Sequence, residues 1–283
     1  MTTHAETIAP GIDVLALRTP TLPPATHTNC YLVGTTEITI VDPGSPWDDQ
    51  RALLVDVIKS RILRGARVVR IVLSHQHHDH VAGAVSLQRS LGRLGPPVPI
   101  AAHPITAKGL RGTLHVDVTL HDLEPLTCGD RVLRVLWTPG HAPGHLAFHD
   151  EASGVVLVGD LVAAVGTIAI DPSDGDLGAY LSSLQRIQDL GPSVLLPSHG
   201  QPIPNATETL ERYIAHRHMR SDQICSALAE HEPCGAEPLV SLVYPDLHPL
   251  AQPLARAQIE SHLIWLRREG RVDGESGAYR LAD

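Results

Sequence analysis

Three imidazoles and one carboxylate stand close together in residues 75–80, which contain the pattern His-x-His-x-Asp-His. So many metal-binding side chains in so short a run suit a metal ion better than a packed core. The run comes directly after the apolar segment 68–73, which has the composition of a buried strand. A strand end holds side chains on a rigid support. The sequence therefore predicts a metal site at this strand end, with His78, the histidine outside the pattern, facing solvent.

Three further residues that can bind a metal also follow short apolar runs: His141, Asp160 and His199. Each alone is weak evidence for a metal ligand, because a lone histidine at a strand end is more often structural and Gly-Asp after a strand is usually a turn. Together with the first motif they make seven ligands, five imidazoles and two carboxylates. Seven exceed the needs of one four-coordinate zinc and fit two metals that share a carboxylate. This ligand chemistry favours zinc, with Fe and Mn as alternatives.

These motifs, in this order, resemble those of the metallo-β-lactamase superfamily of binuclear hydrolases over about residues 11–204. The resemblance implies an α/β fold, the αββα sandwich, in which two sheets lie face to face with helices outside. It also implies a division of the ligands between two divalent metals. In that division His75, His77 and His141 hold one metal, Asp79, His80 and His199 hold the other, and Asp160 bridges both.

The stretch 138–145, Thr-Pro-Gly-His-Ala-Pro-Gly-His, resembles glyoxalase-II-like members of the superfamily. In those members the first histidine binds metal and the second lies near the substrate. We therefore expect His141 to be a ligand and His145 to stand behind the ligands, near the substrate. Asp42 follows a strand-like run and is expected to cap the next helix. In the family the corresponding Asp supports the metal-binding loop, which is the alternative role.

The predicted chemistry is hydrolysis by a hydroxide that bridges two metals. Metals about 3.5–4 Å apart can share one water and lower its pKa toward neutrality. The chain contains no Gly-x-Ser-x-Gly nucleophile elbow. Asp79 is expected to orient or transfer the proton that the leaving group needs, with His145 as a weaker candidate. An ester, thioester, lactone, amide or phosphodiester would suit such a site.

The composition changes after Pro204, which predicts a catalytic domain at 1–204 and a winged-helix-like domain at 205–283. The first domain is expected to contain a hairpin at 29–33 and 37–41 and helices at 47–63 and 177–190. The second is expected to contain three helices, at 206–230, 238–243 and 251–269, and a hairpin at 271–273 and 278–281.

The tail makes the chain similar to the lactamase-like subgroup that includes endoribonucleases acting on single-stranded RNA. A winged helix that binds nucleic acid should be basic on one face. Residues 206–283 instead hold eight Arg, no Lys and twelve acids, although Arg267, Arg268 and Arg271 could form a local patch. The tail is more simply expected to pack on the core, cover the active site or form a homodimer. We therefore favour a small-molecule carboxylic ester, thioester or lactone as substrate, with RNA as the alternative.

Composition sets broad limits on the partners. The 283 residues carry a net charge of −9, which disfavours broad attraction to nucleic acid or anionic membranes. No apolar run is long enough for a membrane span, and the first six residues do not resemble a secretory signal. Four scattered cysteines include no Cys-x-x-Cys pair and are expected to be free thiols. These features favour a cytoplasmic protein without membrane contact.

Overall fold

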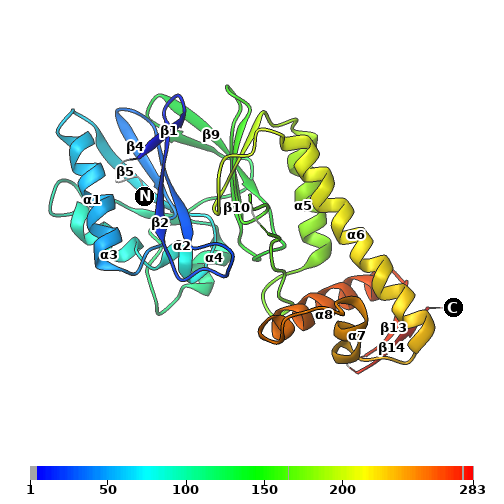
Figure 1. Cartoon of the computed structure of the whole chain (residues 1–283). Helices are drawn as coiled ribbons and strands as arrows, with labels where there is room; N and C mark the ends of the chain where they lie inside the picture. Colours follow the sequence, from blue (N-terminus) through cyan, green and yellow to red (C-terminus); the bar gives the residue numbers. More distant parts are fainter. Residues whose placement is uncertain (1–4, 165, 276, 283) are drawn as a thin grey trace. The chain divides into compact units, whose positions relative to one another are not determined.

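The computed structural model describes residues 5–164, 166–275 and 277–282 (Figure 1). The prediction about a secretory signal falls largely on residues 1–4, outside the described part. The chain divides into two compact units. The first comprises Met1–Thr138, Gly144–Gly166 and Gly191–Ala206, and the second comprises Pro139–Pro143, Thr167–Leu190 and Thr207–Asp283. The chain thus passes between the units several times, and the single domain boundary after residue 204 stays a prediction.

The first unit contains two sheets. One has seven strands in the order of the sequence, antiparallel from β1 to β4 and parallel from β4 to β7. Its strands are β1 (Glu6–Ala9), β2 (Ile12–Arg18), β3 (His27–Val33), β4 (Glu37–Val41), β5 (Arg67–Leu73), β6 (Ile100–Ala102) and β7 (Val118–Thr119). The other has five strands in the order β12-β11-β10-β9-β8. These are β8 (Pro125–Cys128), β9 (Arg131–Trp137), β10 (Leu146–Asp150), β11 (Val155–Gly159) and β12 (Val194–Pro197).

Alternation along the strands divides the core of this unit into two layers, because successive side chains of a strand point to opposite faces. On β3, Cys30 and Leu32 pack in the layer that also holds Leu54 of α1 (Asp48–Ile62) and residues of α3 (Ala84–Leu91). Tyr31 and Val33 pack in the other layer, with side chains of the five-stranded sheet. Two sheets therefore lie face to face, with α1 and α3 on the outer side of the larger one (Figure 1). The short helices α2 (His78–Val81) and α4 (Pro104–Gly109) follow β5 and β6.

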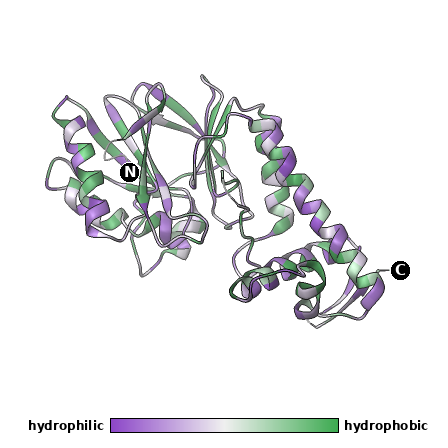
Figure 2. Cartoon of the chain, in the orientation of Figure 1, coloured by the Kyte–Doolittle hydropathy of each residue, from purple (hydrophilic) through white to green (hydrophobic). Residues whose placement is uncertain are grey.

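The second unit is mainly helical. It contains α5 (Leu177–Asp189), α6 (Ala206–His231), α7 (Ala236–Val243), the short η1 (Pro249–Ala251), α8 (Gln252–Arg268) and the hairpin of β13 (Val272–Glu275) and β14 (Ala278–Leu281). A separate apolar core joins α6, α7, α8 and the hairpin, with Ile224, Leu239, Ile259 and Val272 among its members. Figure 2 shows hydrophobic and hydrophilic residues interleaved along α6, as expected of a helix with one buried side. Three helices closed by a hairpin confirm the winged-helix prediction, although Ser276 in the turn lies outside the described residues.

Candidate metal centre

The loop after β5 carries the His-x-His-x-Asp-His pattern. His75 and His80 are fully buried, whereas His78 is exposed, as predicted. Another turn approaches this loop so closely that a Cβ on Gly44 would lie 1.7 Å from the carbonyl oxygen of Asp79. Only glycine permits such contact between two backbones.

Asp42, in that same turn, supports the loop. Its carboxylate accepts hydrogen bonds from the backbone N–H of Ser74 at 2.7 Å, the Ser74 hydroxyl at 2.6 Å and His80 Nδ1 at 3.0 Å. The expected helix cap is wrong, because α1 begins after Trp47 and has no side-chain cap. The carboxylate is instead drawn to three buried donors. The alternative role, support of the metal-binding loop, matches these contacts.

His199 lies in the loop after β12, and hydrogen bonds to residues of β3 fix both its ring and the loop. His199 Nδ1 donates to the carbonyl oxygen of His27 at 2.9 Å. The side-chain amide of Asn29 donates to the carbonyl oxygens of Pro197 and Gly200, each at 2.8 Å, and so fixes the loop on both sides of His199. Neither His27 nor Asn29 was singled out from the sequence. His27 contributes a main-chain oxygen, and Asn29 binds main-chain oxygens. Every residue has such an oxygen, so residue types do not identify these contacts.

His145 lies directly behind Asp160. Its Nε2 accepts the backbone N–H of Asp160 at 3.0 Å, and its Nδ1 lies 2.8 Å from the Thr138 hydroxyl. His145 is fully buried, and a Cβ on Gly159 would lie 2.4 Å from its Nε2. The ring therefore fixes the backbone that carries the Asp160 carboxylate.

The loop that carries His141 is packed against α5. A Cβ on Gly140 would lie 2.2 Å from the Cα of Tyr180, so no other residue fits there. The Ser183 hydroxyl donates to the carbonyl oxygen of Pro139 at 2.7 Å. His141 Nδ1 lies 2.8 Å from the carbonyl oxygen of Ala169 and donates to it.

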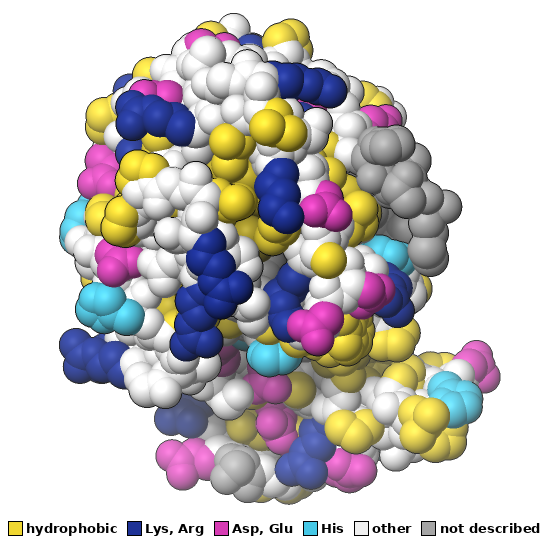
Figure 3. All heavy atoms as spheres, turned by 90° about the vertical axis from the view of Figure 1, so that its left-hand side faces the viewer, with side chains coloured by type: hydrophobic (Ala, Val, Ile, Leu, Met, Phe, Trp, Pro, Cys, Tyr) yellow, Lys and Arg dark blue, Asp and Glu magenta, His cyan; other side chains and the backbone are white. Residues whose placement is uncertain are grey.

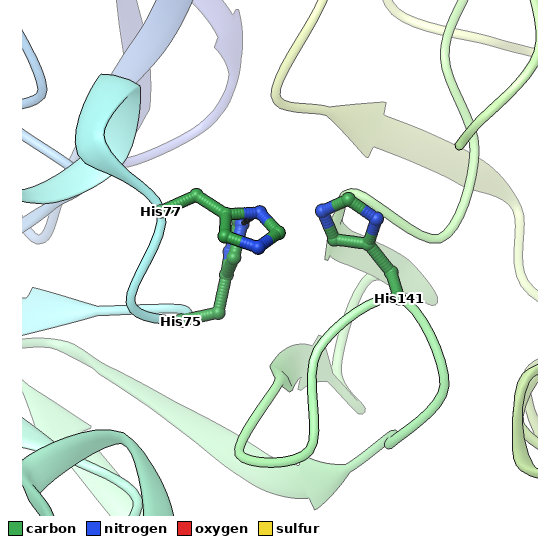
Figure 4. A group of neighbouring side chains, drawn as sticks. All are labelled: His75, His77 and His141. Carbon is green, nitrogen blue, oxygen red and sulfur yellow. Dashed lines mark hydrogen bonds between the residues drawn. The ribbon is translucent and has the colours of Figure 1, made fainter. Parts of the chain in front are cut away.

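One orientation is common to three of the histidines. His80, His141 and His199 each donate Nδ1–H to a fixed oxygen. Such a bond sets the tautomer and leaves Nε2 as the nitrogen that can bind a metal. His75, His77 and His141 bring one ligand atom each within 4.8 Å of one another, and Figure 4 shows their rings gathered together. Two more such groups are His75 with His80 and Asp160, and Asp79 with His80 and His199.

The spacing of these atoms fits a cation. His199 Nε2 lies 3.5 Å from carboxylate oxygens of both Asp79 and Asp160, and His80 Nε2 lies 3.5 Å from Asp160 and 3.8 Å from Asp79. Two ligands about 2.1 Å from a tetrahedral zinc are about 3.4 Å apart. His80 Nε2 is buried and makes no hydrogen bond among the described residues. The distances of 3.5 to 3.8 Å exceed the length of a good hydrogen bond and are close to the separation of two ligand atoms on one metal.

The electrostatics of the cluster favour positive charge. Burial disfavours the charged form of His80, but the carboxylates of Asp160 and Asp79 outweigh burial and raise the pKa of His80 well above its usual range. The pKa of His199 is likewise raised, because Asp160 outweighs burial. Burial alone would raise the pKa of Asp160, but His80 and His199 hold it well below the ordinary value. The same field would favour a divalent cation among these side chains.

The seven predicted ligands, Asp79 among them, thus fall into three overlapping groups, and His145 lies behind Asp160. The profile of the Metallo-beta-lactamase superfamily matches residues 23–199, and that of the Beta-lactamase associated winged helix domain matches residues 236–280. The first match covers more than half of the chain. The chain belongs to the metallo-beta-lactamase superfamily of hydrolases, with a C-terminal winged-helix domain.

Several proteins are similar over most of the chain. The Beta-lactamase-like protein 2 homolog of Drosophila melanogaster is 29% identical over 263 residues, which cover 87% of this chain and 84% of that protein. The Atrochrysone carboxyl ACP thioesterase of Passalora fulva is 29% identical and covers 76% of this chain, which spans 60% of the thioesterase.

Two crystal structures share the fold. A Beta-lactamase domain protein from Burkholderia ambifaria has a TM-score of 0.87 at 24% identity, over 99% of this chain and 94% of that one. A metallo-beta-lactamase family protein from Thermus thermophilus has a TM-score of 0.76 at 26% identity, over 97% of this chain and 100% of that one. Among the helices that the structure describes, none has the length and hydrophobicity to cross a membrane.

Proposed function

We propose that this chain is a binuclear metal-dependent hydrolase of small carboxylic esters, thioesters or lactones. The observation that carries the proposal is the convergence of His80, His199, Asp79 and Asp160 with ligand atoms 3.5 to 3.8 Å apart. In the proposed site His75, His77 and His141 would hold one metal, Asp79, His80 and His199 would hold a second, and Asp160 would serve both. When bound, two divalent ions, most simply zinc, activate water and polarise the carbonyl of the substrate.

The side chains around this site have separate tasks. Asp79 is partly exposed, with 14% of its side chain accessible, so its carboxylate can reach a substrate and pass a proton to the leaving group. His145 has its two ring nitrogens bonded to Thr138 and to the backbone of Asp160. Its task in the proposed site is therefore to hold Asp160 in place, and Asp79 is the better proton carrier.

A cysteine nucleophile has less support. Burial raises the pKa of Cys30 well above its usual range, and it also raises the pKa of Cys128 and Cys225. A thiol must lose its proton to attack a carbonyl carbon efficiently. These three thiols are therefore poorly suited to covalent catalysis.

The thioester part of the proposal draws on the relatives. The similar proteins from Passalora fulva and Aspergillus fumigatus are named as atrochrysone carboxyl ACP thioesterases. The second is 30% identical over 71% of this chain, which spans 59% of that protein. Thioesters, esters and lactones share an electrophilic carbonyl carbon, and the proposed proton transfer from Asp79 would serve the alkoxide that an ester or lactone releases. One site could therefore hydrolyse all three.

The charges give less support to RNA as substrate. Each arginine of the expected basic patch has an acidic partner: Arg267 with Glu275, Arg268 with Asp176 and Arg271 with Asp222. Figure 3 shows basic and acidic side chains interspersed over one face of the molecule. Binding to phosphates would have to break such pairs. A small-molecule substrate imposes no such requirement.

The test is turnover by the Asp160→Ala variant. We expect Asp160→Ala to abolish hydrolysis of a thioester, an ester and a lactone while the protein stays folded, because the carboxylate is proposed to serve both metals. Asp189→Ala, at the exposed end of α5, is the control and should retain full activity. Full turnover by metal-loaded Asp160→Ala would refute the proposal. Metal-dependent cleavage of labelled single-stranded RNA, with no hydrolysis of the three small substrates, would favour the nuclease instead.

A further inference from the structure

The carbonyl oxygen of Ala169 sets the tautomer and the orientation of the His141 ring. A carbonyl only accepts hydrogen bonds, so His141 Nδ1, 2.8 Å away, must carry the proton. Nε2 then has the lone pair and is the nitrogen able to bind a metal. A shift of the Ala169 carbonyl would rotate the ring or release it. The elements that hold Ala169 therefore control this proposed ligand.

Ala169 lies in an irregular segment, residues 167–170, that helices α6 and α8 hold from both sides of the alanine. Arg217 of α6 donates a hydrogen bond to the carbonyl oxygen of Ile168. Gln258 of α8 bonds both backbone groups of Ile170, accepting from its N–H at 3.3 Å and donating to its oxygen at 3.1 Å. The Ser261 hydroxyl donates to the same oxygen at 2.6 Å.

These polar side chains are buried at a cost that packing alone does not explain. Arg217 is 3% exposed and Ser261 is 4% exposed. Among the described residues Arg217 has no carboxylate partner. It instead bonds Gln258 at 3.2 Å and lies 5.2 Å from the ring centre of Tyr180. An apolar side chain would fill this interior at lower cost, because a buried charge without a paired carboxylate is expensive. What the three polar groups share is the backbone on either side of Ala169.

We propose that Arg217, Gln258 and Ser261 are positioning residues for His141, acting through the Ala169 carbonyl. The C-terminal helices would then have a task in the hydrolase itself: they set the tautomer and the direction of one metal ligand. This inference rests on the proposed function only through the assignment of His141 as a ligand. It gives α6 and α8 a role that requires neither RNA nor a second copy of the chain.

The test measures metal affinity directly, by zinc titration against a chromophoric chelator, in the full-length protein. We expect Ser261→Ala and Gln258→Ala each to lower the affinity for one of the two zinc ions about tenfold or more and to leave the affinity for the other unchanged. Removal of the hydrogen bond that supports a metal ligand has an effect of this size. Ser261→Thr keeps the hydroxyl and should restore the affinity. If Ser261→Ala does not fold, Gln258→Ala tests the same role.

The matched control is Ser221→Ala. Ser221 is a fully buried serine of the same core, but it bonds His262 Nδ1 at 2.8 Å and the Arg217 carbonyl, not residues 168–170. It should lower the midpoint of thermal unfolding about as much as Ser261→Ala does, with both zinc affinities unchanged. An equal loss of zinc affinity in Ser221→Ala would show a general effect of destabilising the helices, and would overturn the positioning role.

The variant His141→Ala separates this inference from the proposed function. We expect it to lose one zinc, and Ser261→Ala added to it to cause no further loss, because Ser261 acts through His141. If His141→Ala loses one zinc while Ser261→Ala and Gln258→Ala bind both as the native protein does, the positioning role is wrong and the proposed site stands. If His141→Ala binds two zinc ions at native affinity, the ligand assignment fails and the positioning role fails with it.

Discussion

Asp42 shows how single residues serve this site at a distance from the chemistry. Its backbone is left-handed, with φ of 53°, a conformation uncommon outside glycine but tolerated by Asp and Asn. The strain is offset by three buried hydrogen bonds, to the backbone and hydroxyl of Ser74 and to His80. Removing the carboxylate would therefore harm both the fold and the orientation of His80.

The Asp42→Ala variant should lower the free energy of unfolding by about 3 kcal/mol, because it leaves buried donors on Ser74 and His80 without acceptors. Chemical denaturation followed by circular dichroism measures the change. Asp130→Ala is the matched control, since Asp130 also accepts two hydrogen bonds in a turn, from Thr35, but at an exposed position. It should cost about 1 kcal/mol or less. Equal losses in the two variants would contradict the role given to Asp42.

At the residue scale, the side chains of the site were predictable and their supports were not. The seven proposed ligands stand at strand ends and carry metal-binding groups, so residue type and spacing identify them. The acceptors that orient His141 and His199 are the main-chain oxygens of Ala169 and His27. Every residue has such an oxygen, so only the folded chain shows which ones matter.

At the scale of elements, long periodic segments were predicted well. The predicted helix 206–230 corresponds to α6, and the predicted hairpin at 29–33 and 37–41 corresponds to β3 and β4. The short β8 and α4 were not predicted. β8 begins with Pro125 at the edge of its sheet, and α4 depends on a cap by the His103 side chain, which accepts from Ile105 N–H. Elements of four to six residues have too few positions for a periodic pattern.

Helix α8 carries a buried histidine that should make stability depend on pH. Burial, helped by the nearby charges of Arg217, Arg220, His216 and His218, lowers the pKa of His262 to about 3. Between pH 6.5 and 3 the unfolded chain therefore binds a proton that the folded chain does not. The free energy of unfolding should fall as the pH falls, by about 2 kcal/mol between pH 7 and pH 5 from this group.

The measurement is urea denaturation at pH 7, 6 and 5. The free energy of unfolding of His262→Gln should decrease less from pH 7 to pH 5 than that of the native chain, whatever its value at pH 7. His231→Gln, which changes an exposed histidine at the end of α6, should keep the native pH dependence. An unchanged slope in His262→Gln would show that His262 does not remain neutral in the folded chain.

At the scale of the whole molecule, the two proposed metals should link distant parts of the sequence. The proposed ligands come from the loop after β5, the loop before β10 and the ends of β11 and β12. Ions that bind only the folded arrangement stabilise it by mass action, by about 2.7 kcal/mol when the free metal is at 100 times its dissociation constant. Stability and activity should therefore depend together on metal.

Removal of metal should lower the midpoint of thermal unfolding by several degrees and abolish hydrolysis, and added zinc should restore both. Scanning calorimetry and a thioester assay, before and after dialysis against a chelator, measure the two effects. Recovery of both properties on added zinc is the control for irreversible damage, and the treated protein in buffer without metal or chelator is the control for residual chelator. A metal-stripped protein with native stability and native turnover would contradict a metal-dependent mechanism.

The proposed metal centre is tested most directly by a crystal structure of the zinc-loaded protein, with the metals located by anomalous scattering. We expect two ions about 3.5–4 Å apart. One should be bound by His75, His77 and His141, the other by Asp79, His80 and His199, and both by Asp160. A single ion, or two ions held by other side chains, would contradict the proposed metal centre.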